Sequence, residues 1–159
     1  MPLPTIDSHI WTRDTESFPL HPSCSLSDLD PVSFTAEELL AEAKACRVER
    51  IVLIGHDVFH GYDNSYMLDA MRRFPGKFAV CALIDDRDAT NPPADLMRSL
   101  LGDGVSGFRI DPFPKGKAML DGANRRVDWL EGEGMASMWA CAAGLTICLL
   151  PIVCNYGVS

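Results

Sequence analysis

Residues 50–55 read RIVLIG, a run that is apolar at every position between its two ends. A strand with one solvent-facing side alternates polar and apolar residues, whereas this run would present apolar side chains on both faces. Such strands belong to parallel sheets that are covered by helices. Because parallel neighbours also need crossover connections, this run predicts a fold of alternating strands and helices.

The rest of the chain repeats this unit. Further strands are predicted over residues 5–11, 78–84, 105–110 and 145–150, and helices over residues 35–46, 64–74, 92–101 and 127–143. This alternation indicates parallel βαβ units. The Gly-rich fingerprint of dinucleotide-binding folds is missing after the first strand. We therefore predict an α/β fold of the parallel (β/α)8, or TIM-barrel, type, which is incomplete because about five of the eight strands are present.

Two predicted helices begin with capping residues. Thr35 can cap the first helix, and Glu38 follows three residues later, which completes a capping box. Asn64 is predicted to cap the second helix. The first helix also carries an apolar stripe that includes Leu39 and Cys46.

Residues able to carry chemistry lie at the C-terminal ends of the predicted strands, where the active sites of parallel barrels are found. They are Asp7, His9, Trp11, His56, Asp57, Asp85, Asp86, Arg109 and Asp111. Two imidazoles, several carboxylates and a guanidinium on one rim could bind a metal or an anionic substrate.

The same residues also fit structural roles. The two histidines can be hydrogen-bonded loop residues, and the adjacent Asp85 and Asp86 suit a turn. Arg109 lies within an apolar segment, so it needs either a position at the rim or a salt bridge with Asp111 or Asp85.

Four segments occur in the order of a known family. Residues 6–11 (IDSHIW), 61–70 (GYDNSYMLDA), 73–78 (RFPGKF) and 104–110 (GVSGFRI) resemble the amidohydrolase-related family, which includes lactonases that act on sugar lactones and pyrone dicarboxylates. The resemblance extends over roughly residues 5–150. It implies a (β/α)8 barrel that hydrolyses C–O or C–N bonds in cyclic esters, amides or related groups of small-molecule substrates.

The resemblance also implies roles for individual residues. Metal-using members carry His-x-His on the first strand, which binds a divalent metal, often zinc. His9 matches the first histidine, but Trp11 replaces the second, so we expect no tightly bound zinc. Arg109 and His56 are then the expected substrate-binding residues, because a guanidinium holds a carboxylate in bidentate geometry. No catalytic residue is assigned.

The family takes further histidines and a general-base aspartate from later strands. We therefore predict that residues 1–150 form the N-terminal part of such a barrel, that residues 151–159 are a divergent tail, and that the chain is an inactive, truncated hydrolase. The alternative is a non-catalytic half-barrel with a binding or regulatory role, membrane-associated through the uncharged residues 135–154. Exposed strand edges predict self-association.

Charge and cysteine content exclude other classes. The net charge of −8 disfavours nucleic-acid binding, which needs clustered Lys and Arg. The six cysteines form no C-x-x-C pair, which indicates reduced core thiols. The N-terminal residues contain no signal peptide pattern, so a cytoplasmic location is expected.

Overall fold

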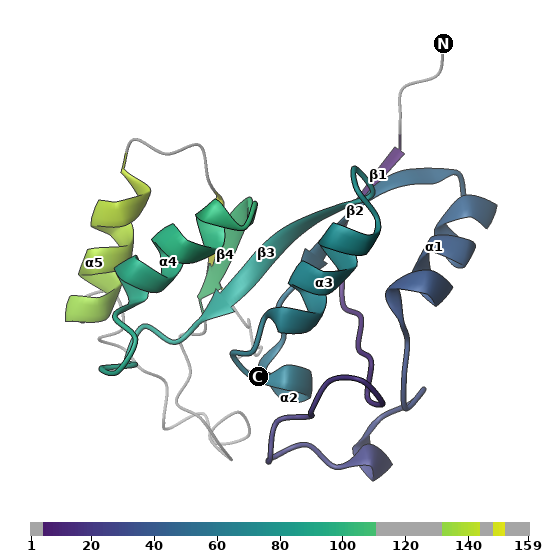
Figure 1. The fold of residues 1–159 in the computed structure, drawn as a ribbon, viewed down its shortest axis with the longest axis horizontal. Coiled ribbons are helices and arrows are strands. Elements are labelled where there is room, and N and C mark those ends of the chain that lie inside the picture. The colour runs from purple at the N-terminus through teal and green to yellow at the C-terminus, as the bar shows by residue number, and fades with distance from the viewer. Residues whose placement is uncertain (1–4, 111–131, 144–147, 152–159) are drawn as a thin grey trace, which may run out of the picture.

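The computed structural model describes residues 5–110, 132–143 and 148–151. Its strands form one parallel sheet in the order β1-β2-β3-β4-β5. The strands are β1 (Thr5–Ile10), β2 (Val48–Ile54), β3 (Phe78–Ile84), β4 (Gly107–Ile110) and β5 (Cys148–Pro151). Parallel strands in sequential order are the arrangement of a (β/α)8 barrel, so the predicted fold class is confirmed (Figure 1).

Helices connect the strands. They are η1 (Leu26–Asp28, a 3₁₀ turn), α1 (Ala36–Ala45), α2 (Asp57–His60), α3 (Ser65–Arg73), α4 (Pro93–Gly102) and α5 (Glu133–Ala142). Helix α1 packs on β2, α3 and α4 pack on β3, and α4 lies beside α5 (Figure 1). The largest fully buried side chains of the core are Tyr66, Phe108, Ile51, Leu53, Leu83, Ile84, Met97, Met135, Met138 and Val80.

Several predicted boundaries are corrected. Strand β2 begins at Val48 rather than at residue 50, and β4 begins at Gly107 rather than at residue 105. The Val105 amide donates to the Leu100 carbonyl, so it belongs to the end of α4. Predicted helical residues 127–131 and strand residues 145–147 lie outside the described residues.

The uncharged residues 135–154 carry α5 and then β5. In the described part of the chain, no helix is long and apolar enough to cross a membrane. The described cysteines are not in disulfides. Among them, the expectation of core thiols holds for Cys81, which is buried, while Cys141 is partly buried against the core. Cys46 caps the C-terminus of α1 and is exposed, so its predicted place on the apolar stripe is wrong.

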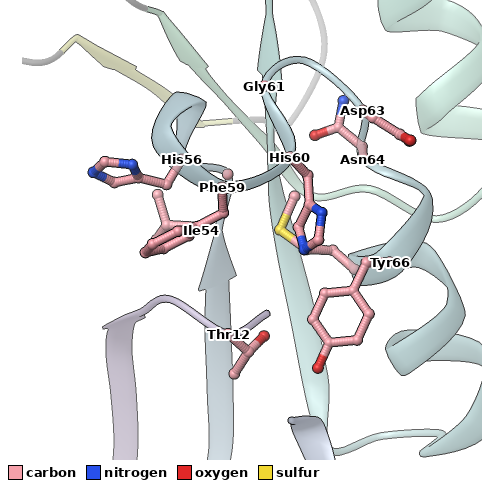
Figure 2. Close-up of a pocket in the computed structure, with 11 residues that line it drawn as sticks. Thr12, Ile54, His56, Phe59, His60, Gly61, Asp63, Asn64 and Tyr66 are labelled. Atoms are coloured by element: carbon pink, nitrogen blue, oxygen red, sulfur yellow. The ribbon is translucent and has the colours of Figure 1, made fainter. Parts of the chain in front are cut away.

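Helix α2 is an additional element that the sequence did not predict. It begins directly after β2, with His56 as its N-cap residue (Figure 2). The next helix, α3, begins after Asn64, but the Asn64 side chain makes no capping bond, which corrects the predicted cap. Asp63 takes that role, since its Oδ1 accepts from the Ser65 amide over 2.9 Å. The Asn64 carboxamide instead reaches β3.

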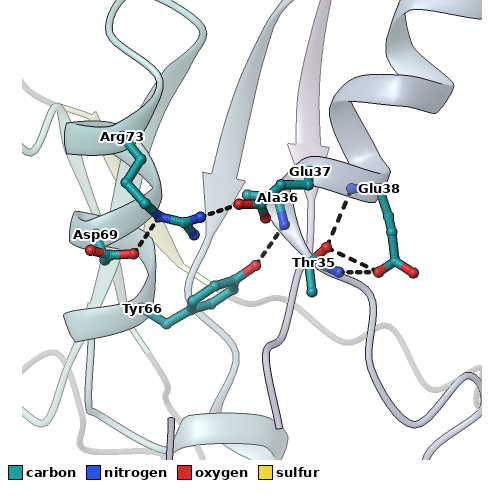
Figure 3. Close-up of polar contacts among 7 residues, drawn as sticks. All are labelled: Thr35, Ala36, Glu37, Glu38, Tyr66, Asp69 and Arg73. Atoms are coloured by element: carbon teal, nitrogen blue, oxygen red, sulfur yellow. Dashed lines mark hydrogen bonds and ion pairs between the residues drawn. The ribbon is translucent and has the colours of Figure 1, made fainter. Parts of the chain in front are cut away.

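The start of α1 is fixed both locally and from α3 (Figure 3). Thr35 and Glu38 form the predicted capping box, which is confirmed. The Tyr66 hydroxyl accepts from the Ala36 amide over 2.7 Å, and this bond is buried. Arg73 forms ion pairs with Asp69 on its own helix and with Glu37 on α1. These contacts hold α1 against α3 on the outside of the sheet.

Candidate functional site at the rim of the sheet

Three side chains from different strand ends meet at one place. The Trp11 and His56 rings have their centroids 4.4 Å apart in an edge-to-face arrangement. The Arg109 guanidinium lies 5.8 Å from the centroid of the Trp11 ring. Its Nη1 donates to the Gly55 carbonyl, directly before His56, over 2.9 Å. The structure thus brings together His56 and Arg109, as expected for residues at the C-terminal ends of parallel strands.

The His56 ring is oriented by the start of α2. Its Nδ1 accepts from the Val58 amide over 3.2 Å and lies 3.4 Å from Asp57 Oδ1. A ring nitrogen that accepts from an amide carries a lone pair, so the neutral ring has its proton on Nε2. Figure 2 shows the ring projecting away from His60 and Tyr66. His56 can therefore present an Nε2–H donor at the rim.

Arg109 is only 6% exposed. A buried guanidinium stays charged and is costly unless polar groups compensate for its lost hydration. The Gly55 carbonyl provides such compensation, and the Trp11 ring adds a cation–π contact. Both contacts come from residues at the ends of neighbouring strands, which fixes the guanidinium at the rim rather than on the outer surface.

A second cation extends this arrangement. The Phe59 ring lies 5.2 Å from the His56 ring, and the Arg13 guanidinium lies 4.7 Å from the Phe59 centroid. Arg13, Phe59, His56, Trp11 and Arg109 thus form a continuous series of contacts, which we call the rim stack. It combines two permanent positive charges with three aromatic rings.

The two acidic residues after β3 serve different purposes. Asp85 Oδ1 accepts from the Arg87 amide over 3.1 Å and from Arg87 Nε over 3.0 Å, so its predicted role in a turn is confirmed. Asp86 is 5% exposed, and its carboxylate lies 3.9 Å from the same guanidinium. Asp111 lies outside the described residues.

The predicted metal ligand is His9, whose side chain lies outside the described part of the structure. Among the residues whose side chains are described, no group of three or more His, Cys, Asp or Glu side chains could hold a metal ion. Trp11, which takes the place of the second histidine in a His-x-His pattern, packs against His56. The described residues therefore do not make up a site for zinc.

A small cavity of about 20 Å³ lies behind the rim (Figure 2). Thr12, His60 and Tyr66 contribute polar groups to its wall. His60 Nδ1 lies 3.0 Å from the Pro19 carbonyl, which ties α2 to the long loop after β1. Burial raises the pKa of Tyr66, although nearby hydrogen-bonding groups partly oppose this effect. The cavity has room for about one water molecule and not for a substrate.

The sequence alone did not indicate Arg13 and Phe59 as site residues. Arg13 lies in the long loop, and its backbone forms a bridge with Phe34. Phe59 lies in α2, which has only four residues and so shows no helical periodicity. The one available signal was the pair Phe59-His60, three and four residues after His56.

Comparison with solved structures shows the same fold in longer proteins. The chain superposes on a probable 2-pyrone-4,6-dicarboxylic acid hydrolase from Acinetobacter baumannii, solved with citric acid bound, with a TM-score of 0.65 and 17% identity over 94% of this chain and 49% of that one. An apo structure of an Agrobacterium tumefaciens protein gives a TM-score of 0.61 and 16% identity over 94% and 48%. The chain thus has the fold of about half of these proteins.

These similarities concern the fold alone, because the identities are low. No family model matches the sequence, and the comparison with curated proteins gave no match.

Proposed function

We propose that this chain supplies half of the substrate-binding rim of an amidohydrolase-type hydrolase that acts on a carboxylate-bearing cyclic ester or amide. The observation that carries the proposal is the convergence of Arg109, His56 and Trp11 at the C-terminal ends of parallel strands. This is the edge of a (β/α)8 barrel where substrates bind. The fold shared with a probable pyrone dicarboxylic acid hydrolase supports the same class of substrate.

Four members of the rim stack have a task in this proposal. Arg109 pairs with a carboxylate of the substrate, because a guanidinium offers donors in a planar fork. The Nε2–H of His56 donates to the carbonyl oxygen of the scissile group, where negative charge develops during attack by water. Trp11 and Phe59 provide aromatic surface for a flat ring. No metal-dependent step is included, since the described residues do not form a metal site.

Hydrolysis itself is proposed to need groups that this chain does not provide. The chain spans about half the length of the solved structures it matches. In the described sheet, β1 and β5 are the edge strands, so the sheet is open. We therefore expect the chain to bind a carboxylate ligand without turning over a lactone, and to associate through these edges. The open sheet also favours a second candidate function, a non-catalytic half-barrel that binds ligand or a partner chain.

Calorimetric titration with citrate tests the proposed binding. Arg109→Gln should weaken citrate binding about tenfold or more, because it removes a charged donor. Arg98→Gln is the matched control, since Arg98 lies on α4 and pairs with Asp95 on the surface over 2.7 Å. Equal citrate affinity in the two variants would reject the rim as the carboxylate site. A parallel screen for hydrolysis of carboxylated lactones separates the two candidate functions.

A further inference from the structure

The hydrogen-bond ladder between β2 and β3 changes at its C-terminal end. Ile54 is paired with Cys81 in the register, and the Gly55 amide donates to the Cys81 carbonyl over 2.8 Å. In a regular parallel ladder, the amide and the carbonyl of one residue bond two different residues of the neighbouring strand. The residue that accepts from the amide lies two positions before the residue that donates to the carbonyl, so an amide bond to Cys81 goes with a carbonyl bond to Leu83. The Gly55 carbonyl would therefore accept from the Leu83 amide.

Asn64 takes that bond instead. The Leu83 amide donates to Asn64 Oδ1 over 2.9 Å, and Asn64 Nδ2 donates to the Leu83 carbonyl over 3.0 Å. Nδ2 also donates to the Tyr62 carbonyl over 3.1 Å, and the whole residue is buried. A carboxamide has the same donor and acceptor as a peptide group. Asn64 thus continues the β2 side of the ladder by one unit after the chain has turned into α2.

The Gly55 carbonyl then receives a different donor, because Leu83 has a single N–H and that N–H is used by Asn64. Nη1 of Arg109 donates to the Gly55 carbonyl over 2.9 Å. Arg109 is the register partner of Leu83 on β4, so its side chain crosses β3 to reach the end of β2. The bond between Leu83 and Asn64 thus leaves the Gly55 carbonyl to accept from Arg109.

We propose that Asn64 is a positioning residue for Arg109, which acts by withdrawing the Leu83 amide from the Gly55 carbonyl. The inference rests on the proposed function only in that Arg109 binds the substrate carboxylate. Without Asn64, the Leu83 amide can bond the Gly55 carbonyl, which then divides its two lone pairs between that amide and Arg109, and the guanidinium is held less firmly. The hydrogen bonds of the Asn64 side chain go to Leu83 and Tyr62, so its proposed effect on Arg109 runs through the Gly55 carbonyl.

The test combines two measurements on the full chain. ¹⁵N NMR of protein labelled at arginine, dissolved or sedimented, follows rotation of the Arg109 guanidinium, and citrate titration measures ligand affinity. In the unmodified protein, Arg109 should give a resolved Nη signal with slow bond rotation, identified by its loss in Arg109→Gln. Asn64→Ala should abolish the slow rotation and weaken citrate binding several-fold, up to about tenfold. Asn64→Asp keeps the acceptor for the Leu83 amide and should retain the slow Arg109 signal.

The matched control is Asp63→Ala, which removes the cap of α3 but leaves both bonds between Asn64 and Leu83. A purely structural role for Asn64 predicts that Asn64→Asp is as harmful as Asn64→Ala, since both lose the bond to the Leu83 carbonyl. Unchanged Arg109 rotation in Asn64→Ala would overturn the proposal, as would an equal loss in Asp63→Ala.

Two further outcomes are decided by the unmodified protein. If Asn64→Ala does not fold, the unmodified chain and Asn64→Asp decide the matter. A slow Arg109 signal in both proteins supports the proposal. Absence of that signal from the unmodified chain overturns it. If the unmodified chain binds no citrate, the proposed function fails, and the NMR comparison still decides the role of Asn64.

Discussion

Replacing Gly55 with alanine should destabilise the protein, because two backbones meet at this glycine. A Cβ at Gly55 would lie 2.8 Å from both the amide nitrogen and the Cβ of Leu83, whereas ordinary van der Waals contact begins at 3.4 Å. Leu83 cannot easily move away, since Asn64 bonds both its amide and its carbonyl. Inserting a methyl group into such a packed position costs about 1–3 kcal/mol. We expect the free energy of unfolding in urea to fall by this amount.

Gly102→Ala provides the comparison. Gly102 is the last residue of α4, and a Cβ there would meet nothing within 4 Å. The added methyl group should favour the helix and stabilise the protein by up to about 1 kcal/mol. The two variants therefore change stability in opposite directions under the same assay, which can be followed by circular dichroism. A Gly55→Ala protein with unchanged unfolding midpoint and slope would refute the close approach of β2 and β3.

Four further outcomes are expected. Tyr66→Phe leaves the buried Ala36 amide without its acceptor, which should cost about 1–3 kcal/mol in urea unfolding. Burial raises the pKa of Tyr66 above its usual value of 10.0, so the hydroxyl loses its proton at lower pH in the unfolded chain than in the folded protein. The free energy of unfolding should therefore fall as pH rises above about 10. In unfolding curves recorded between about pH 9 and 11, Tyr66→Phe should lack the part of this fall that comes from Tyr66. Thr35→Ala removes the capping box and should cost about 1 kcal/mol, and an unaltered unfolding midpoint would argue against that cap. Elemental analysis of dialysed protein should find far less than one equivalent of zinc, since tetrahedral sites need three or four protein ligands.

The fold could be predicted because its signals are local and repeated. The apolar strand that ends at Ile54 and the capping box of Thr35 and Glu38 each reflect neighbouring residues, and the structure contains both. Helix α2 was missed because four residues are too few to show periodicity. The start of β4 moved by two residues because the Val105 amide bonds the Leu100 carbonyl at the end of α4 and not a neighbouring strand.

The site could be predicted only in outline. His56 follows β2 and Arg109 lies near the C-terminal end of β4, so parallel topology places them at one rim. The bond between Arg109 and Gly55 was not predictable, because its acceptor is a backbone carbonyl 54 positions away in the sequence. Asn64 was misassigned for the same reason. An asparagine before a helix usually caps it, and nothing nearby in the sequence signals that its carboxamide pairs with Leu83, 19 residues further along.

A crystal structure of the full chain grown with citrate would test the central claim most directly. The claim predicts a carboxylate within hydrogen-bonding distance of the Arg109 guanidinium and of His56 Nε2, with the Gly55 carbonyl still bound to Arg109. Citrate bound away from the rim, or Arg109 and His56 on opposite ends of the sheet, would contradict it.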